Sequence, residues 1–245
     1  MKNAPEKYRI IWYDELDSTN AELQRRISEL DNLSVAAALT QTAGRGQKGN
    51  RWLSAPGENL TFSILLRPET LPLSEFMSIT YLATLAVRDY LRSQGVDAVI
   101  KWPNDIYVGR KKICGMLIES VVADKTLMAA IIGIGLNLNQ TDFPGELPNP
   151  TSARLLTGRS FDLKLALEEL MSIFVRLLPL LQNEAGRESL KERYETGLFQ
   201  KGEVRRYRDF RSGELIDGKI LGIAKDGRLN LDGRLYDFKE IGYLL

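Results

Sequence analysis

The stretch KWPNDIYVGRKKICGMLIE, Lys101–Glu119, is the most informative part of the sequence about the fold. Two strand-like runs, Asp105–Val108 and Lys112–Ala123, flank a tight turn at Gly109-Arg110-Lys111. Runs of β-branched and apolar residues around such a turn predict two consecutive strands. Strands joined by short turns pair antiparallel, so the sheet is expected to be largely antiparallel or mixed. The expected fold class is therefore α+β, not an alternating βαβ fold.

The rest of the chain supplies further strands and helices around this pair. Strands are expected at Arg9–Tyr13, Ser34–Gln41, Asn59–Arg67, Ala98–Trp102 and Leu127–Leu138. A first helix is expected to begin at a Thr19-x-x-Glu22 capping box and to end near Leu30, and a second runs from Glu75 to about Gln94. A third is expected to begin at an Asp162 cap and to break near Pro179, and a fourth covers Gly186–Thr196. After residue 197 the sequence pattern changes to short strand-like runs separated by glycines, several of them in Asp-Gly pairs, which are typical of hairpins. We predict a main domain over residues 1–197 and a small all-β domain over residues 198–245.

Composition excludes several classes of function. Lys and Arg number 33 against 32 Asp and Glu, so the net charge of +1 does not favour nucleic acid or an anionic membrane as the main partner. The chain has no histidine and a single cysteine, Cys114. His-based catalytic triads, His-containing zinc sites and intrachain disulfides are therefore excluded, and a reducing, cytoplasmic setting is expected. The longest uncharged stretch, Thr126–Thr141, is too short to span a membrane, and the N-terminus has no signal-peptide pattern.

A glycine-rich loop, TAGRGQKGNRW at Thr42–Trp52, matches the spacing of the dinucleotide-binding fingerprint at Gly44-x-Gly46-x-x-Gly49. That fingerprint requires a helix that begins at its last glycines. Here Pro56 and Gly57 break any helical run soon after the loop, and the P-loop pattern is also absent. The spacing of the glycines is therefore not decisive.

Two readings of this loop remain open from its residues alone. Its charges can be those of a solvated loop with no specific role. Alternatively, glycine lets the backbone approach a ligand closely, and Arg45, Lys48 and Arg51 add affinity for anions. The second reading describes a loop that folds over a phosphorylated ligand.

The order of the motifs along the chain resembles that of the biotin protein ligases. GRGQKGNRW is followed by KWPNDIY and by a Lys-Ile-Cys-Gly variant of the K-L/I-x-G segment. Asp17-Ser18-Thr19-Asn20, Gln41-Thr42 and Gly133-Ile134-Gly135-Leu136-Asn137 fit in the same order. The resemblance runs from about Ile10 to Leu245 and implies a class II aminoacyl-tRNA-synthetase-like catalytic domain with a small SH3-like C-terminal domain. Because it begins so near Met1, a short form without an N-terminal DNA-binding domain is expected.

The resemblance also implies an activity. The family joins biotin to ATP, which gives biotinoyl-5′-AMP and pyrophosphate, and then passes the biotinoyl group to one lysine of a biotin carboxyl carrier domain of a carboxylase. Biotin, ATP and Mg²⁺ are thus the expected substrates and cofactor, and the metal ligands are unknown. Neither DNA nor a membrane is an expected partner, and a homodimer is left open.

The first step brings two anions together, so the site needs cations. By resemblance Lys112 reaches both the biotin carboxylate and the α-phosphate, and Arg45 and Asp105 complete the catalytic set. Without the resemblance, Lys112 reads as a solvated turn lysine and Pro103-Asn104-Asp105 as a plain turn. The implied biotin site comprises Ser18, Thr19, Asn20, Gln41, Gly44, Arg45, Gly46, Gln47, Lys112 and Gly115. The implied ATP and adenylate site comprises Arg45, Lys48, Trp52, Lys101, Asn104, Lys112 and Asn137.

One residue departs from the common form of the family. Many relatives carry arginine after Gly-Arg-Gly, whereas this chain has Gln47. We hypothesise that the adenylate is held less tightly here, because a neutral amide replaces a charge-assisted contact.

Two other functions remain as alternatives. Lipoate or octanoate ligation or transfer occurs on a related fold, but the apolar flanks of Cys114 argue against an activated thiol. A biotin-responsive binding or regulatory protein would show no turnover.

Overall fold

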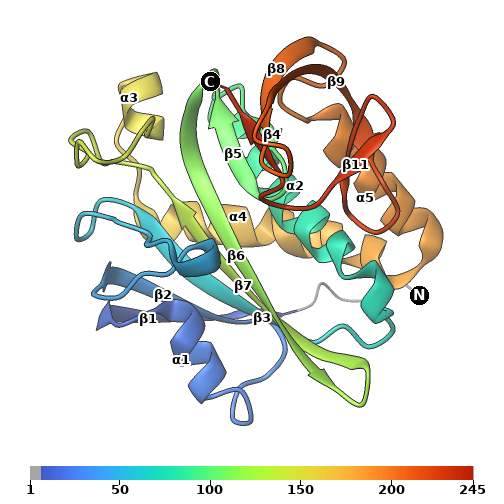
Figure 1. Ribbon diagram of the computed structural model, residues 1–245. Helices are drawn as coiled ribbons and strands as arrows, with labels where there is room; N and C mark the ends of the chain where they lie inside the picture. Colours follow the sequence, from blue (N-terminus) through green and yellow to red (C-terminus); the bar gives the residue numbers. More distant parts are fainter. Residues whose placement is uncertain (1–6, 245) are drawn as a thin grey trace.

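The computed structural model describes residues 7–244, apart from the side chain of Lys48. Its centre is a seven-stranded sheet (Figure 1). The strand order is β1 (Arg9–Leu16), β2 (Ser34–Gln41), β3 (Leu60–Leu66), β7 (Thr126–Leu136), β6 (Lys111–Ala123), β5 (Asp105–Val108) and β4 (Val99–Lys101). Only β1 and β2 pair in parallel; the other neighbours pair antiparallel. The predicted α+β class with a largely antiparallel sheet is confirmed.

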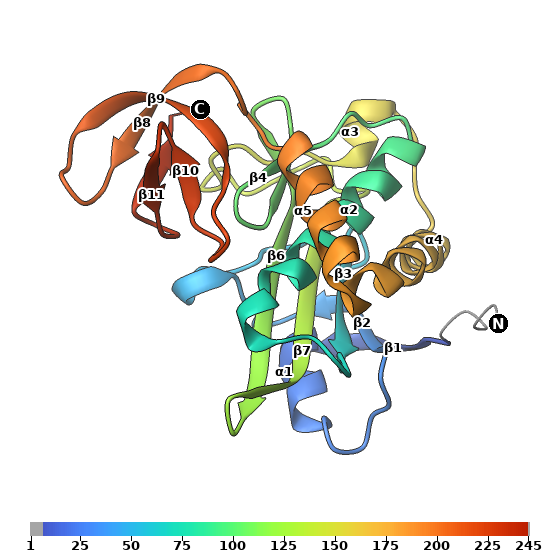
Figure 2. The ribbon, with the colours of Figure 1, turned by 90° about the vertical axis from the view of Figure 1, so that its right-hand side faces the viewer.

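Helices cover the two faces of this sheet unequally. Those of the described chain are α1 (Thr19–Arg25), α2 (Met77–Ser93), α3 (Ala153–Thr157), α4 (Leu163–Leu177) and α5 (Glu184–Thr196), with 3-10 turns η1 (Gln47–Gly49), η2 (Leu73–Glu75) and η3 (Leu178–Gln182). Figure 2 shows α2, α4 and α5 together on one side of the large sheet. Their apolar residues form the main core with the sheet, and α1 belongs to a second, smaller cluster.

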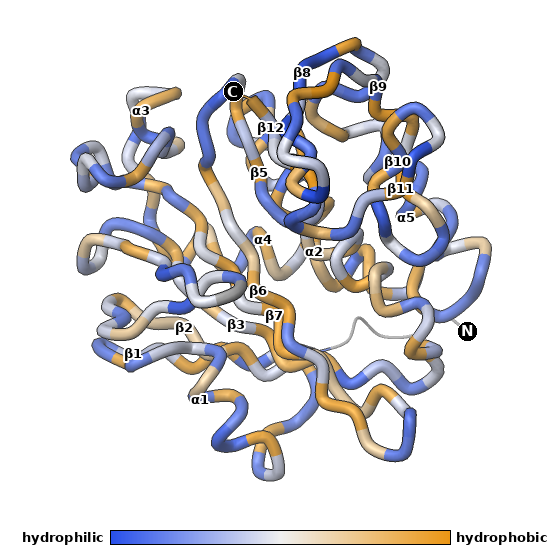
Figure 3. Tube along the Cα trace, in the orientation of Figure 1, coloured by the Kyte–Doolittle hydropathy of each residue, from blue (hydrophilic) through white to orange (hydrophobic). Residues whose placement is uncertain are grey.

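The strand β3 shows how the sequence divides these two faces. Leu60, Phe62 and Ile64 are fully buried in the main core, whereas Leu65 belongs to the smaller cluster with Leu23 of α1. Successive side chains of a strand point to opposite faces, so Ser63 lies on the same face as Leu65. This second face of the sheet carries the candidate site. Figure 3 shows hydrophobic stretches along β6 and β7, which lie in the middle of the sheet.

The first helix differs from its prediction at both ends. The first helix ends at Arg25 instead of near Leu30, and Ser18 is its N-cap residue, with no side-chain capping bond. The predicted capping box is wrong because the Thr19 hydroxyl bonds Gln41 instead. The short helix α3 was not predicted. In contrast, Asp162 caps α4 as predicted, by accepting bonds from two backbone N–H groups.

A second, five-stranded sheet contains the C-terminal residues. Its order is β11 (Arg234–Tyr236), β10 (Leu229–Leu231), β9 (Leu215–Ile223), β8 (Val204–Asp209) and β12 (Ile241–Tyr243), with every pair antiparallel. Figure 1 shows it beside α5 and β5. The bonds that join it to the large sheet and its helices include Ile223 N to Glu195 Oε1 (2.8 Å) and Trp102 Nε1 to Gly227 O (3.1 Å). Over residues 7–244, no helix is long and apolar enough to cross a membrane.

Candidate active site

A cavity of about 170 Å³ gathers residues that lie far apart in the sequence. Its walls come from the start of α1, the glycine-rich loop, the Trp102–Asp105 turn, β6 and β7. Most of the predicted site residues line it: Ser18, Thr19, Asn20, Gln41, Arg45, Gly46, Gln47, Trp52, Lys101, Asn104, Asp105, Lys112 and Gly115. The structure thus brings together most of the predicted biotin residues and most of the predicted adenylate residues.

One end of this cavity is a polar hydrogen-bond network. Gln41 Oε1 accepts from Thr19 N (2.8 Å) and Thr19 Oγ1 (3.2 Å). Ser63 Oγ lies 2.7 Å from Thr19 Oγ1 and 2.5 Å from Asn20 Oδ1, and Asn20 Nδ2 donates to Glu119 Oε2 (2.7 Å). The network fixes the Thr19 and Asn20 side chains, and it offers both donors and acceptors to a polar ligand group.

Sequence reasoning missed two members of this network. Ser63 is fully buried in β3, and a small hydroxyl in a buried, mostly apolar strand is the signal that could have found it. Glu119 lies on β6 and also pairs with Arg45, whose Nη2 is 3.0 Å from Glu119 Oε2. Arg45 is therefore held at the polar end of the cavity. Both partners of this pair are partly exposed, so the pair adds little stability.

The other end of the cavity is charged. Lys112 Nζ lies 2.7 Å from Asp105 Oδ1 on the neighbouring strand β5. The Lys112 backbone is also fixed, because its N–H donates to Asn149 O (2.7 Å) and its carbonyl accepts from Thr151 N (2.9 Å). The ammonium group of Lys112 is thus held in place by a strand pairing, a loop and a carboxylate.

Glycines on β6 and β7 let the Trp52 indole lie against the sheet. A Cβ atom on Gly135 would be 2.2 Å from Trp52 Cε2, and one on Gly115 would be 3.1 Å from Trp52 Cζ3 and 3.0 Å from Lys112 Nζ. The Lys112 ammonium lies 5.9 Å from the centre of the Trp52 ring. A side chain at either glycine would displace the indole. The absence of a side chain at Gly115 and Gly135 therefore gives the cavity its shape.

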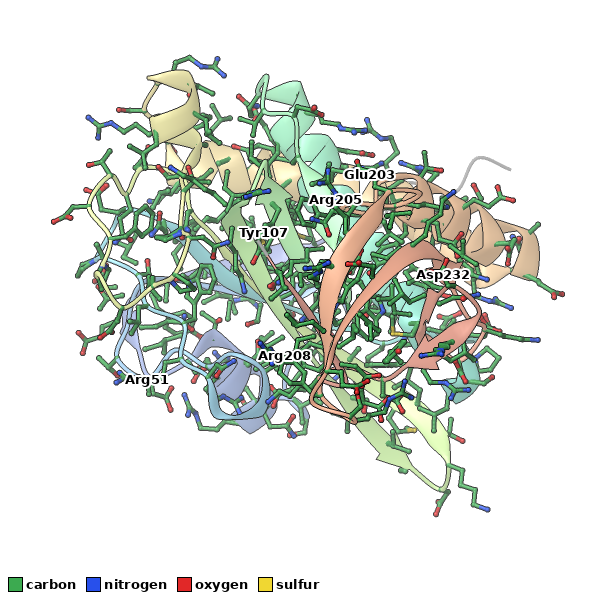
Figure 4. All side chains as sticks on the ribbon, turned by 45° about the horizontal axis from the view of Figure 1, so that its top comes forward. Arg51, Tyr107, Glu203, Arg205, Arg208 and Asp232 are labelled. Atoms are coloured by element: carbon green, nitrogen blue, oxygen red, sulfur yellow. The ribbon has the colours of Figure 1, made fainter. Side chains whose placement is uncertain are left out.

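A second cavity, of about 520 Å³, adjoins the first. Lys112, Asp105 and Trp52 line both cavities. Figure 4 labels Arg51 and Tyr107, which line the second cavity from the glycine-rich loop and from β5. The loop from Phe143 to Pro150 supplies most of its remaining wall.

Asn137 lines this second cavity, not the first. Its Nδ2 donates to Thr151 O (3.0 Å), whereas its buried Oδ1 has no hydrogen-bond partner among the described residues. A buried, unpaired acceptor is costly, so this position favours a ligand that brings a donor.

Residues 12–137 match the biotin/lipoate A/B protein ligase family, which is about half of the chain. The protein belongs to this family. It is 37% identical over 162 residues to the bifunctional ligase/repressor BirA of Bacillus subtilis, which covers 62% of this chain and 48% of that relative. It is 33% identical over 168 residues to a biotin–acetyl-CoA-carboxylase ligase of Paracoccus denitrificans, which covers 65% of this chain and 69% of that relative. The chain thus spans about half the length of the B. subtilis relative.

A solved structure extends the likeness to nearly the whole chain. The biotin protein ligase of Aquifex aeolicus in complex with biotin and ATP has a TM-score of 0.79 at 27% identity, and it covers 96% of this chain and 97% of that one. The resemblance expected from the motifs is confirmed.

Gly44, Asn104 and Lys48 complete the set of predicted site residues. Gly44 does not line the first cavity, and a Cβ atom there would be 2.5 Å from the Trp52 carbonyl oxygen. The side-chain amide of Asn104 is already engaged, because its Nδ2 donates to the backbone carbonyl of Met116. The side chain of Lys48 lies outside the described part of the structure. Cys114 is fully buried, and burial raises the pKa of its thiol well above the usual range.

Proposed function

We propose that this protein is an ATP-dependent biotin protein ligase. It forms biotinoyl-5′-AMP from biotin and ATP and then transfers biotin to a specific lysine of a biotin carboxyl carrier domain. The observation that carries the proposal is that Lys112, Asp105 and Trp52 line both cavities. A carboxylate bound in one cavity and a nucleotide bound in the other would meet at the Lys112 ammonium. The A. aeolicus ligase, solved with biotin and ATP, supports this pairing of ligands.

Biotin fits the first cavity by its chemistry. Its ureido head needs both donors and acceptors, which the Thr19, Asn20 and Gln41 end provides. Its apolar body would lie against Gly115 and the Trp52 indole, and its carboxylate would reach Lys112. Ligand sites commonly combine an apolar slot with a few placed polar groups in this way.

In the adenylation step, biotin in the first cavity would react with ATP in the second. A carboxylate oxygen of biotin attacks the α-phosphorus, a C–O–P bond forms, the bond to the β-phosphate breaks and pyrophosphate leaves. Lys112 offsets the charge of both anions in the transition state, and Lys101 adds a second ammonium group to the first cavity. Asn137 Oδ1 would accept a hydrogen bond from the adenine base.

Mg²⁺ would be held mainly by the ATP phosphates. No cluster of three metal-ligating side chains occurs among residues 7–244, but Mg²⁺ commonly uses only one or two carboxylates together with phosphates and water. Of the two carboxylates that line the second cavity, Asp105 is paired with Lys112, so Glu146 is the one that would contact the ion. When bound, the ion would neutralise phosphate charge.

Transfer needs a free amine at the same place. The acceptor lysine amine attacks the carbonyl carbon of biotinoyl-5′-AMP, an amide forms and AMP leaves. Asp105, whose carboxylate is 2.7 Å from Lys112 Nζ, would orient Lys112 or the acceptor lysine and could accept the proton of the attacking amine. The buried Cys114, with its raised pKa, does not suit the thiol route of an octanoyl transferase.

Biotin-dependent exchange of pyrophosphate into ATP tests this proposal, with lipoate as a competing substrate. Replacing Lys112 with alanine should lower the exchange rate by about 100-fold or more, because one preorganised charge partner of the transition state is lost. Lys111→Ala is the matched control, since Lys111 is exposed at the edge of the same strand and should keep full exchange. Exchange with lipoate but not biotin, or full activity of Lys112→Ala, would contradict the proposal.

A further inference from the structure

The ammonium group of Lys101 lies against two tyrosine rings from different parts of the fold. Its Nζ lies 3.3 Å from Tyr107 OH and 4.9 Å from the Tyr107 ring centre. It also lies 5.1 Å from the ring centre of Tyr243. Lys101 and Tyr107 belong to β4 and β5 of the large sheet, whereas Tyr243 belongs to β12 of the C-terminal sheet. A residue near the end of the chain therefore contacts a lysine of the first cavity.

We propose that Tyr243 is a positioning residue for Lys101, through which the C-terminal sheet fixes the place and the charge of an ammonium group in the adenylation site. This inference rests on the proposed function. It adds that the C-terminal sheet contributes to the first chemical step through one aromatic ring.

The surroundings of Tyr243 favour a role for its ring and not for its hydroxyl group. The ring packs against Phe199 (6.1 Å between centres) and edge-on against Tyr207 (5.5 Å). The buried hydroxyl has no hydrogen-bond partner among the described residues. An unpaired buried hydroxyl is a cost that phenylalanine would avoid. The contribution of Tyr243 is therefore expected to come from the face of its ring.

The ring stabilises the charged form of Lys101. Burial lowers the pKa of Lys101, the Asp105 carboxylate raises that pKa, and the Lys112 ammonium lowers it. Tyr107 and Tyr243 are the other titratable groups that face it. A ring face attracts a cation, so the two tyrosines offset part of the cost of burial. Replacing the Tyr243 ring with an aliphatic side chain keeps much of the burial and removes this attraction, so the Lys101 pKa should fall further.

The test is the pH profile of kcat/KM for ATP in biotin-dependent pyrophosphate exchange, which reports pKa values of the free enzyme. Tyr243→Leu should move the alkaline limb to lower pH by about half to one unit, the size expected for one cation–ring contact. Tyr243→Phe keeps the ring and should follow the wild-type profile. A Leu profile that coincides with wild type, or a Phe variant that shifts like Leu, would overturn the inference.

Two controls separate this role from simple destabilisation. Tyr236→Leu removes another buried ring of the C-terminal sheet, one that contacts Arg211 (4.0 Å). It should leave the alkaline limb in place, and a shift equal to that of Tyr243→Leu would refute the positioning role. In a Lys101→Met background, Tyr243→Leu should cause no further shift, because the titrating group is gone. A further shift in that background would also refute it.

Failure of the inference is distinguishable from failure of the proposed function. If the wild-type protein shows no biotin-dependent exchange at all, the proposed function fails. If the wild type exchanges and the variant profiles coincide, only the role of Tyr243 fails.

Discussion

Individual cations of the site differ in how firmly they are held. Lys112 has a fixed backbone and a carboxylate 2.7 Å away, so its ammonium group is already in place before a ligand binds. Arg45 instead forms a partly exposed pair with Glu119, at the polar end of the cavity. Such a pair is weak and can exchange for a ligand anion. Lys112 and Arg45 both count simply as cations in the composition. What distinguishes them in the structure is the set of groups that each one contacts.

Gln47 is the residue at which a change should strengthen binding. It lies in η1, lines the first cavity, and its buried Oε1 has no hydrogen-bond partner among the described residues. Gln47→Arg should slow the release of biotinoyl-5′-AMP by about tenfold or more, because a charge-assisted contact contributes about 1.5–3 kcal/mol. Rapid gel filtration of the labelled enzyme–adenylate complex measures this rate. Gln182→Arg adds the same charge at an exposed residue of η3 and should not change the rate. Equal release from wild type and Gln47→Arg would sink the hypothesis.

The central strands β6 and β7 act as the floor of the site. On β7, Ala130 and Ile132 belong to the main core on the helix side, whereas the glycines Gly115, Gly133 and Gly135 line the cavity. A Cβ atom on Gly133 would be 2.2 Å from Asn20 Oδ1, just as one on Gly135 would meet Trp52. Glycine in a strand interior normally weakens it, so close approach of another group explains these positions.

Adding one methyl group to β7 tests this account. Gly135→Ala should lower biotin-dependent exchange by about tenfold or more, because the overlap with the Trp52 indole costs about 1–3 kcal/mol and displaces the ring. Steady-state exchange kinetics and the fluorescence of the tryptophans would report both effects. Gly145→Ala is the control, since its new Cβ would meet no atom within 4 Å. Wild-type kinetics for Gly135→Ala would show that the indole does not need this place.

At the scale of the whole molecule, the C-terminal sheet is joined to the site by a few specific contacts. Trp102 precedes the turn that carries Asn104 and Asp105, and its indole donates to Gly227 O. Glu195, at the end of α5, accepts from the backbone of Ile223 and lies 3.4 Å from Lys201 Nζ. The division of the chain at residue 197 stays a prediction, but these bonds link the two sheets.

Removing one of these contacts should destabilise the protein measurably. Glu195→Ala leaves the N–H of Ile223 without its acceptor, which costs about 1–3 kcal/mol. For a chain of this size the melting temperature should fall by about 3–8 °C. Thermal unfolding followed by circular dichroism measures this. Glu192→Ala, on the exposed side of the same helix, is the control, and an equal fall in both variants would contradict the role of Glu195.

Periodicity, turn residues and motif order are local properties, and they predicted the fold class, the seven strands of the large sheet and the family. The strands Ser34–Gln41 and Asp105–Val108 have the predicted bounds. Motif order also identified Lys112, Asp105 and Trp52 as site residues, although their roles stay predictions.

The contact partners of these residues follow from the tertiary structure alone. The Thr19 hydroxyl bonds Gln41 instead of capping its helix, because strand β2 brings that amide next to it. Ser63, Glu119 and Tyr243 join the site through contacts with residues far away in the sequence. No local pattern encodes such contacts, since they depend on how separate strands and the two sheets come together. The same packing explains why Lys112, Asp105 and Trp52 each line both cavities.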